Sequence, residues 1–157
     1  MIVLVDGPSG SGKTTLATRL GILLRLPVIH MDDFYPGWSG LAAGSDIIAA
    51  SVLKTTNPGY YRWDWANDRA GEWVPVPPGA KIIEGAGAVT AETLRAASIS
   101  DHQVAAIMLT GEATTRYRRT MRRDPYYEPY WKMWSEQEKR HYAVQSQGLG
   151  DLVPTLR

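Results

Sequence analysis

The chain has 157 residues, of which 44% are hydrophobic, and it carries a net charge of +1 and no cysteine. This length suits one domain over residues 1–157, and a charge this close to neutral creates no long-range field that would attract nucleic acid or an anionic membrane. Without cysteine there are no disulfides, thiolate nucleophiles or zinc–thiolate sites, and apolar runs of about five residues are far shorter than the roughly 20 that span a bilayer. We therefore expect a soluble, cytoplasmic protein with neither a nucleic-acid nor a membrane partner.

The first 31 residues predict a strand, a helix and a second strand. Residues 2–5, "IVLV", form an unbroken apolar run of the kind found in parallel sheets that are covered on both faces. Leucines recur at helical spacing over residues 16–24, and Pro27 ends this helix. The segment "PVIHM" (27–31) then predicts a short strand that leads into an acidic pair.

The middle of the chain is predicted to change from helix to irregular structure and back to strand. "SDIIAASVLK" (45–54) is expected to be helical, with Ser45 or Asp46 as its cap. Residues 57–79 are rich in proline, glycine and aromatics, so we expect them to be irregular. "KIIEGAGA" (81–88) predicts another buried strand.

Helices and strands also alternate over the last third of the chain. Helices are expected at 90–98, 112–123 and 130–145, with a break at Asp124-Pro125, and strands at 103–109 and within "DLVPTLR" (151–157). Strands that alternate with helices predict βαβ units with right-handed crossovers. The expected fold class is therefore α/β, a three-layer sandwich around a mostly parallel, doubly wound sheet.

The segment between the first strand and the first helix has a phosphate-binding pattern. Residues 7–14, "GPSGSGKT", match G-x-x-x-x-G-K-[ST] completely, and a plain flexible turn is the weaker interpretation because a strand and a helix flank it. Glycines let backbone N–H groups converge on phosphate oxygens, and the helix N-terminus adds a positive dipole. The pattern predicts a nucleoside triphosphate, with ATP and Mg²⁺ as cofactors and Lys13 on the β- and γ-phosphates. The expected nucleotide ligands here are Gly7, Ser9, Gly10, Ser11, Gly12, Lys13, Thr14 and Thr15.

Carboxylates are predicted at the carboxyl ends of two strands, where ligands of a doubly wound sheet collect. A kinase needs one carboxylate to accept a proton from the attacking hydroxyl and another near the metal ion. Asp32 fits the first role and Glu84 the second, although a helix cap or turn is the alternative for the pair Asp32 and Asp33. The expected metal ligands are Thr14, Asp32 and Glu84.

The segments "DGPSGSGKTT", "HMDDFY" and "IIEG" resemble the uridine kinase family of P-loop small-molecule kinases, within the P-loop NTPases. The resemblance implies Asp32 as the catalytic base, Glu84 in the Mg²⁺ shell and phosphoryl transfer to a hydroxyl of a nucleoside-like small molecule. "RWDWANDR" (62–69) is similar to the family's acceptor-pocket segment, and "TRYRRTMRRD" (115–124) is similar to its lid helix. The resemblance thus implies an acceptor-binding insertion over about 34–79 and a lid over about 112–135.

Helical spacing alone separates the arginines of this lid segment into two faces. At 100° per residue Arg116, Arg119 and Arg123 fall within a narrow arc, whereas Arg118 and Arg122 point nearly the opposite way. We expect the first face to close over the triphosphate, with Arg119 and Arg123 binding it; a solvated basic face or an RNA-binding patch is the alternative. The expected catalytic residues are therefore Asp32, Lys13, Arg116 and Arg119.

Aromatic residues gather between the expected base and the expected metal ligand. These aromatics are Tyr35, Trp38, Tyr60, Tyr61, Trp63, Trp65 and Trp73. Flat side chains beside a phosphate site suit a planar base or a sugar face, although about half of them should pack in the core. The expected acceptor-binding residues are Asp33, Tyr35, Tyr61, Arg62, Trp63, Asp64, Trp65 and Arg69.

Two other functions stay open at this point. A nucleoside-monophosphate kinase would use extra arginines for the acceptor phosphate, for which Arg62 and Arg69 are candidates. A non-catalytic regulatory protein that binds ATP or GTP is the other, although the guanine-reading N-K-x-D pattern is absent from the sequence. The expected partner is a small-molecule acceptor, and a homodimer is left open.

Overall fold

Five parallel strands form the central sheet of the computed structural model, which describes residues 1–99, 103–149 and 155–156. In spatial order the strands are β2 (Val28–His30), β5 (Lys81–Glu84), β1 (Ile2–Asp6), β6 (Val104–Leu109) and β7 (Thr155–Leu156). All four pairings between neighbours are parallel, which confirms the predicted class of sheet. The predicted strand at the end of the chain is present as β7, and the rest of that prediction lies outside the described residues.

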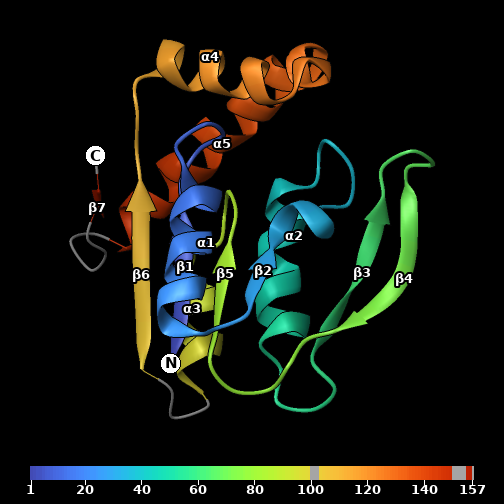
Figure 1. Ribbon diagram of the computed structural model, residues 1–157, viewed down its shortest axis with the longest axis vertical. Coiled ribbons are helices and arrows are strands. Elements are labelled where there is room, and N and C mark those ends of the chain that lie inside the picture. Colours follow the sequence, from blue (N-terminus) through green and yellow to red (C-terminus); the bar gives the residue numbers. More distant parts are fainter. Residues whose placement is uncertain (100–102, 150–154, 157) are drawn as a thin grey trace.

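Helices cover the sheet on both faces. Side chains of a strand alternate between faces, so Val3 and Val5 pack with Ala17 of α1 (Lys13–Leu24), whereas Ile2 and Leu4 join the larger core on the other side. That larger core includes α3 (Ala91–Ser98) and α5 (Glu128–Leu149). Figure 1 shows α1 on the near side of the sheet and α3 behind it. The predicted three-layer arrangement is therefore confirmed.

The helix expected over 45–54 begins earlier, and the prediction that Ser45 or Asp46 caps it is wrong. Helix α2 (Leu41–Ile47) starts after Gly40 and continues into a π-helical turn, η2 (Ile48–Val52). Ser45 is buried inside the helix, where its hydroxyl donates to the Gly87 carbonyl at 2.7 Å. The early start depends on tertiary packing, because the ring of Tyr35 lies against the helix at Gly44.

Residues 57–79 are not irregular, as the prediction had them, but contain a β-hairpin. Strand β3 (Gly59–Asp64) pairs antiparallel with β4 (Arg69–Pro75), and a bulge lies between Tyr61 and Trp63. The β-propensity of the aromatic residues outweighs Gly71 inside β4 and the prolines, which lie at or beyond the strand ends. Figure 1 shows the hairpin beside the main sheet, beyond α2.

The predicted pair of helices near the C-terminus is present, with its break at the predicted place. Helix α4 (Ala113–Arg123) begins after Glu112, whose carboxylate accepts from the backbone N–H groups of Thr114 and Thr115. A short 3₁₀ turn, η3 (Pro125–Tyr127), then leads into α5. Figure 1 shows α4 above the carboxyl end of β6. Within the described ranges, none of the helices has the length and apolarity needed to cross a membrane.

Candidate active site

The predicted phosphate-binding loop connects β1 to α1, as expected, and leaves open space at the start of the helix. Gly12 is the N-cap of α1 with φ of 100°, and a Cβ placed there would meet no atom within 4 Å. Gly10, with φ of 77°, instead lies against the Arg116 carbonyl of α4. The backbone of the loop is therefore open at Gly12 and covered by α4 at Gly10, and both positions have the positive φ that favours glycine.

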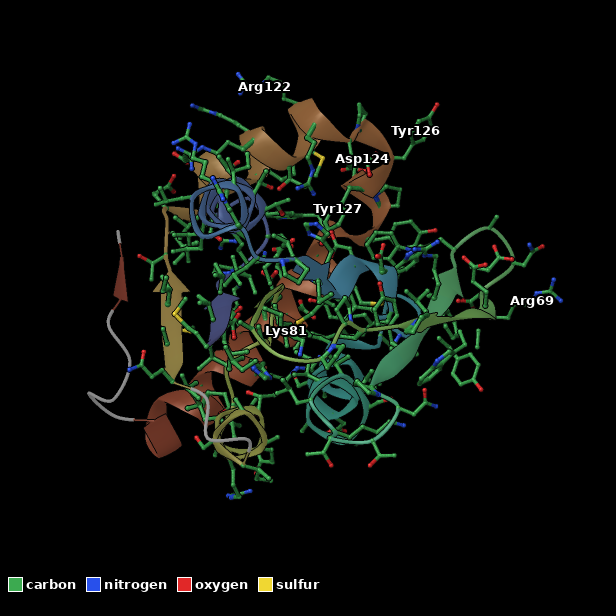
Figure 2. The ribbon with its side chains drawn as sticks, turned by 60° about the horizontal axis from the view of Figure 1, so that its bottom comes forward. Arg69, Lys81, Arg122, Asp124, Tyr126 and Tyr127 are labelled. Atoms are coloured by element: carbon green, nitrogen blue, oxygen red, sulfur yellow. The ribbon has the colours of Figure 1, made fainter. Side chains whose placement is uncertain are left out.

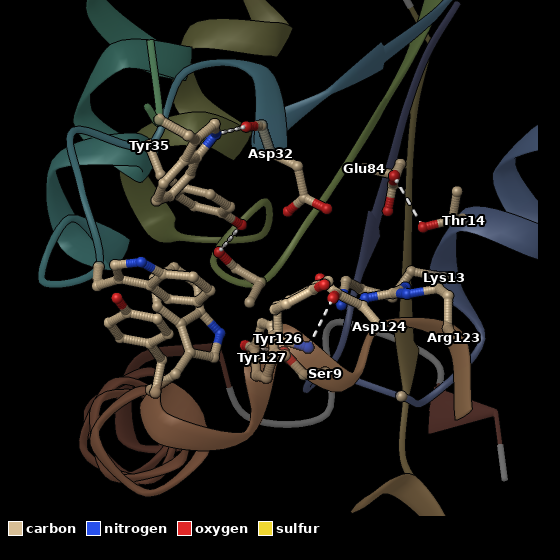
Figure 3. Close-up of a pocket in the computed structure, with 16 residues that line it drawn as sticks. Ser9, Lys13, Thr14, Asp32, Tyr35, Glu84, Arg123, Asp124, Tyr126 and Tyr127 are labelled. Carbon is tan, nitrogen blue, oxygen red and sulfur yellow. Dashed lines mark hydrogen bonds between the residues drawn. The ribbon is translucent and has the colours of Figure 1, made fainter. Parts of the chain in front are cut away.

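A hydroxyl and a carboxylate meet at the phosphate end of the site. The Thr14 hydroxyl donates to Glu84 Oε1 at 3.1 Å (Figure 3). The same oxygen lies 2.7 Å from His30 Nδ1. Glu84 is buried at the end of β5, in register with Val5 of β1. The hydrogen bond to Glu84 raises the pKa of His30 above 6.5, against the lowering effect of burial.

These oxygens fit a magnesium site of the kind that is completed by its ligand. Mg²⁺ takes one or two protein oxygens and keeps water and phosphate oxygens for the rest of its shell. Thr14 and Glu84 supply two such oxygens beside the loop. Throughout the described part of the chain, no group of three or more His, Asp or Glu side chains gathers to hold a metal by itself.

Asp32 lies opposite the loop in the 3₁₀ turn η1 (Met31–Asp33), directly after β2. Solvent reaches its carboxylate through the mouth of the cavity, but protein surrounds it on the other sides. This desolvation raises the pKa of Asp32 above 3.8, while the charge of Lys13 acts in the opposite direction. A carboxylate with a raised pKa is a better proton acceptor near neutral pH than an ordinary aspartate.

One cavity of about 390 Å³ joins the loop, the two acids and a wall of aromatic rings. Figure 3 shows Lys13, Thr14 and Glu84 on one side of Asp32, and Tyr126 and Tyr127 on the lid side. Its aromatic lining consists of Tyr35, Trp38, Trp65, Tyr126, Tyr127, Tyr130 and Trp134. The cavity has the size and the mixed lining of a small-molecule site.

The rings of this wall pack on one another around Trp38. Its indole stacks on Tyr130 with centroids 4.0 Å apart and planes 2° from parallel, and Trp65 and Tyr127 lie at 5.2 and 5.0 Å. Of the seven aromatics expected between residues 34 and 79, three line the cavity: Tyr35, Trp38 and Trp65. Tyr35 and Tyr60 are buried in the core and Trp38 packs against it, so three of the seven pack there, close to the half that was expected.

Most of the other expected acceptor residues lie on or beside the hairpin. Asp33 accepts from the Tyr60 hydroxyl at 3.1 Å, and Tyr61 packs edge-on against Trp73. Arg62 pairs with Glu72 at 2.9 Å. Within the described chain, the cavity lining includes none of the expected residues Asp33, Tyr61, Arg62, Trp63, Asp64 and Arg69.

Arg69 is exposed and contacts other residues of the hairpin. Its Nε lies 3.8 Å from Asp64, which also accepts from the Asn67 side chain. Figure 2 shows Arg69 at the outer end of the hairpin, pointing away from the rest of the molecule. A role for the hairpin arginines in binding the acceptor therefore stays a prediction, one that needs the hairpin to move.

The three arginines expected on one face of the lid have different surroundings. Arg123 lines the cavity together with Asp124. Arg116 is largely buried and donates to the Ser9 carbonyl at 2.9 Å. Arg119 is exposed and, among the residues that the structure describes, lies outside the lining. Figure 2 shows Arg122 on the outer side of α4, as the helical spacing predicted.

Sequence reasoning missed two buried carboxylates, one at the strand end before the loop and one that contacts the loop, because their partners are distant in the chain. Asp6 is fully buried and accepts from the N–H groups of Gly87 and Val89 and from the Tyr142 hydroxyl, at 2.8–2.9 Å. Glu138 accepts from the Ser9 N–H at 2.7 Å. The signal that could have found them is the four-residue spacing of Glu138 and Tyr142, which places both on one face of a helix.

Glu138 and Tyr142 belong to one stripe on α5 with a spacing of four residues. The stripe consists of Tyr130 on Trp38, Trp134 on Tyr35, Glu138 on Ser9 and Tyr142 on Asp6. Residues four apart lie on the same face of a helix, so α5 contacts both the aromatic wall and the phosphate-binding loop. This single helix therefore joins the two halves of the site.

Comparison with known proteins finds similar folds among solved structures. No protein-family model and no curated protein sequence matches the chain. A solved structure described as a possible uridine kinase from Bacillus stearothermophilus is similar, with a TM-score of 0.63 and 18% identity over 100% of this chain and 88% of that one.

Two further solved structures are similar at lower scores. A gluconokinase from Sinorhizobium meliloti 1021 has a TM-score of 0.50 and 14% identity over 98% of this chain and 79% of its own. An uncharacterized protein from Eubacterium ventriosum ATCC 27560 has a TM-score of 0.50 and 14% identity over 93% and 76%. Likeness at such identities concerns the fold, so the chain has the α/β fold of P-loop kinases, as predicted.

Proposed function

We propose that the protein is a small-molecule kinase that transfers the terminal phosphoryl group of Mg-ATP to a hydroxyl of a small acceptor. The observation that carries this proposal is the placement of Asp32 in one cavity with Lys13 and Glu84. Phosphoryl transfer needs this combination of a phosphate cradle, a metal ligand and a carboxylate that faces the incoming hydroxyl.

Each of these groups has a definite task in the proposed reaction. Asp32 accepts the proton of the acceptor hydroxyl, whose oxygen attacks the terminal phosphorus while the bond to ADP breaks. Lys13 and Arg123 bring positive charge to the side of the cavity where the phosphates would lie. Mg²⁺, when bound by Thr14 and Glu84, would neutralise phosphate charge.

The cavity walls favour an acceptor that carries no phosphate of its own. Among the described residues the only lysine and arginine in its lining are Lys13 and Arg123, and both are needed for the triphosphate. The hairpin arginines that could serve a monophosphate acceptor are already paired with Glu72 and Asp64. Aromatic rings instead offer flat faces to a neutral, nucleoside-like alcohol.

A panel assay tests the proposal. Purified protein with Mg-ATP is mixed with nucleosides, nucleoside monophosphates and sugars, and ADP release is measured for the wild type and for Asp32→Asn. We expect acceptor-dependent release with at least one neutral alcohol, its loss in the variant, and nearly unchanged ATP binding. Full turnover in the variant would exclude Asp32 as the base, and release only with monophosphates would favour a nucleoside-monophosphate kinase.

A further inference from the structure

Ser9, in the phosphate-binding loop, is held at three of its atoms by the C-terminal part of the chain. Its N–H donates to Glu138 Oε1 at 2.7 Å, and its carbonyl accepts from Arg116 Nη1 at 2.9 Å. Its hydroxyl lies 3.1 Å from the Tyr127 hydroxyl. The peptide units on both sides of Ser9 are therefore fixed by α4 and α5.

The two charged partners of Ser9 are themselves buried side by side. Their side chains are 12% exposed for Arg116 and 3% exposed for Glu138, and Nη1 of the first lies 3.7 Å from Oε2 of the second. In the described part of the chain Oε2 has no hydrogen-bond partner. A buried carboxylate is unfavourable unless a cation compensates it, so the glutamate depends on the arginine for its charged state.

A second donor of Arg116 and the face of its guanidinium also contact protein atoms. Its Nε donates to the Gly111 carbonyl at 3.1 Å, and its guanidinium lies over the ring of Trp131, 5.8 Å from the centroid. The neighbouring Gly10 packs directly on the Arg116 backbone carbonyl. Arg116 thus connects α4 to the loop through both its main chain and its side chain. Its guanidinium is held by protein atoms, unlike that of an arginine that is free to bind phosphate.

We propose that Arg116 and Glu138 are positioning residues, which act through Ser9 to keep the phosphate-binding loop in the shape that binds the diphosphate part of the nucleotide. The inference rests on the proposed function, because it requires a bound nucleotide. It reassigns Arg116, which the sequence placed among the catalytic groups. Main-chain N–H groups bind phosphate well only when the loop is already in place, so loosening Ser9 weakens binding before any chemistry.

ADP separates this role from a catalytic one. An arginine that contacts the transferring group loses its partner when the terminal phosphate is absent, so its removal changes turnover and leaves ADP affinity almost intact. A residue that shapes the loop affects ADP and ATP alike, because both nucleotides place their diphosphate there. The ratio of the two affinity losses is therefore the diagnostic quantity.

The experiment measures equilibrium binding of Mg-ADP and Mg-ATP by calorimetry, for the wild type, Arg116→Ala, Glu138→Gln and the double variant. Arg122→Ala is the matched control, since it removes an arginine from the outer side of the same helix. We expect each single variant to weaken both nucleotides by about tenfold, the size of a lost hydrogen bond to a charged group. The double variant should lose less than the product of the two, because both residues act on Ser9.

Thermal unfolding of the same proteins shows whether a loss of nucleotide affinity comes from a loss of stability. Arg116→Ala leaves the Glu138 charge buried and should lower the melting temperature, and adding Glu138→Gln should recover part of that loss. An Arg116→Ala protein that loses ATP affinity but keeps ADP affinity would overturn the inference. A double variant whose loss of affinity equals the product of the two single losses would overturn it as well. A wild type that binds neither nucleotide would instead overturn the proposed function.

Discussion

The indole N–H of Trp65 donates to the backbone carbonyl of Asp32 at 3.1 Å. This bond joins the end of the hairpin to the turn that presents the proposed base, two segments that are 33 residues apart. Trp65 also lines the cavity. The proposed function therefore gives this ring two tasks, as a wall for the acceptor and as a support for Asp32.

Trp65→Phe separates these two functions, because it keeps a flat ring and removes the donor. We expect the catalytic rate with the best acceptor to fall by up to about tenfold, the scale of one neutral hydrogen bond, with a smaller change in the acceptor's KM. Trp73→Phe on the other hairpin strand is the control, since Trp73 packs on Tyr61 away from the cavity. Equal losses in both variants would mean that the hairpin acts only through its stability.

The raised pKa of Asp32 predicts the acid limb of the activity profile. Burial raises this pKa above 3.8, whereas the charges of Lys13 and Arg123 lower it. The base must be ionised, so kcat/KM should fall as the pH drops through the raised value, which lies above 3.8. Arg123→Gln removes one of the opposing charges and should move the limb to higher pH, whereas Arg118→Gln, on the outer face, should leave it in place. A limb that stays fixed in Arg123→Gln would show that another group controls it.

The contact between His30 and Glu84 makes stability depend on pH. The folded pKa of His30 is raised above 6.5, so its contribution is fully present below pH 6.5 and is lost as the pH rises through the folded value. The melting temperature of the wild type should therefore fall from mildly acidic to alkaline pH more steeply than that of His30→Asn. Parallel curves for the two proteins would show that this contact does not stabilise the fold.

Two glycines of the phosphate-binding loop should differ in their tolerance of a methyl group. Both have positive φ, so alanine at either position should cost about 1–3 kcal/mol of unfolding free energy from backbone strain. A Cβ at Gly12 meets open space, but one at Gly10 collides with the Arg116 carbonyl and would add about 1–3 kcal/mol of overpacking. Chemical denaturation of Gly10→Ala and Gly12→Ala measures the difference; equal losses would show that α4 moves away from the loop without cost.

Local signals were enough to predict most of the fold. The unbroken apolar run of β1, the glycine pattern after it and the break before Pro125 each depend on residues next to one another in the chain. The start of α2 and the hairpin could not be predicted in this way. Ser45 resembles a helix cap locally, but it is buried because Gly87 provides an acceptor for it. Such features depend on packing between distant segments, which outweighs local propensity.

In the candidate site, too, local patterns predicted some residues and missed those that depend on contacts between distant segments. Lys13, Thr14, Asp32 and Glu84 meet around one cavity, as the strand-end rule predicted for a parallel sheet. The contact of Glu138 with Ser9 spans 129 residues, and no pattern near either residue indicates it. Of the acceptor residues expected on the hairpin, all of which the structure describes, only Trp65 lines the cavity. A run of polar and aromatic side chains does not reveal which of them point inward.

The stripe on α5 has a consequence for the order in which the protein matures during synthesis. The loop that would cradle the phosphates leaves the ribosome early, yet its partner Glu138 is translated 129 residues after Ser9, and Tyr142, the partner of Asp6 just before the loop, follows later still. A nascent chain therefore carries the complete nucleotide motif in an unsupported form. Affinity for nucleotide should appear only when the last long helix has docked, so that binding reports completion of the whole domain.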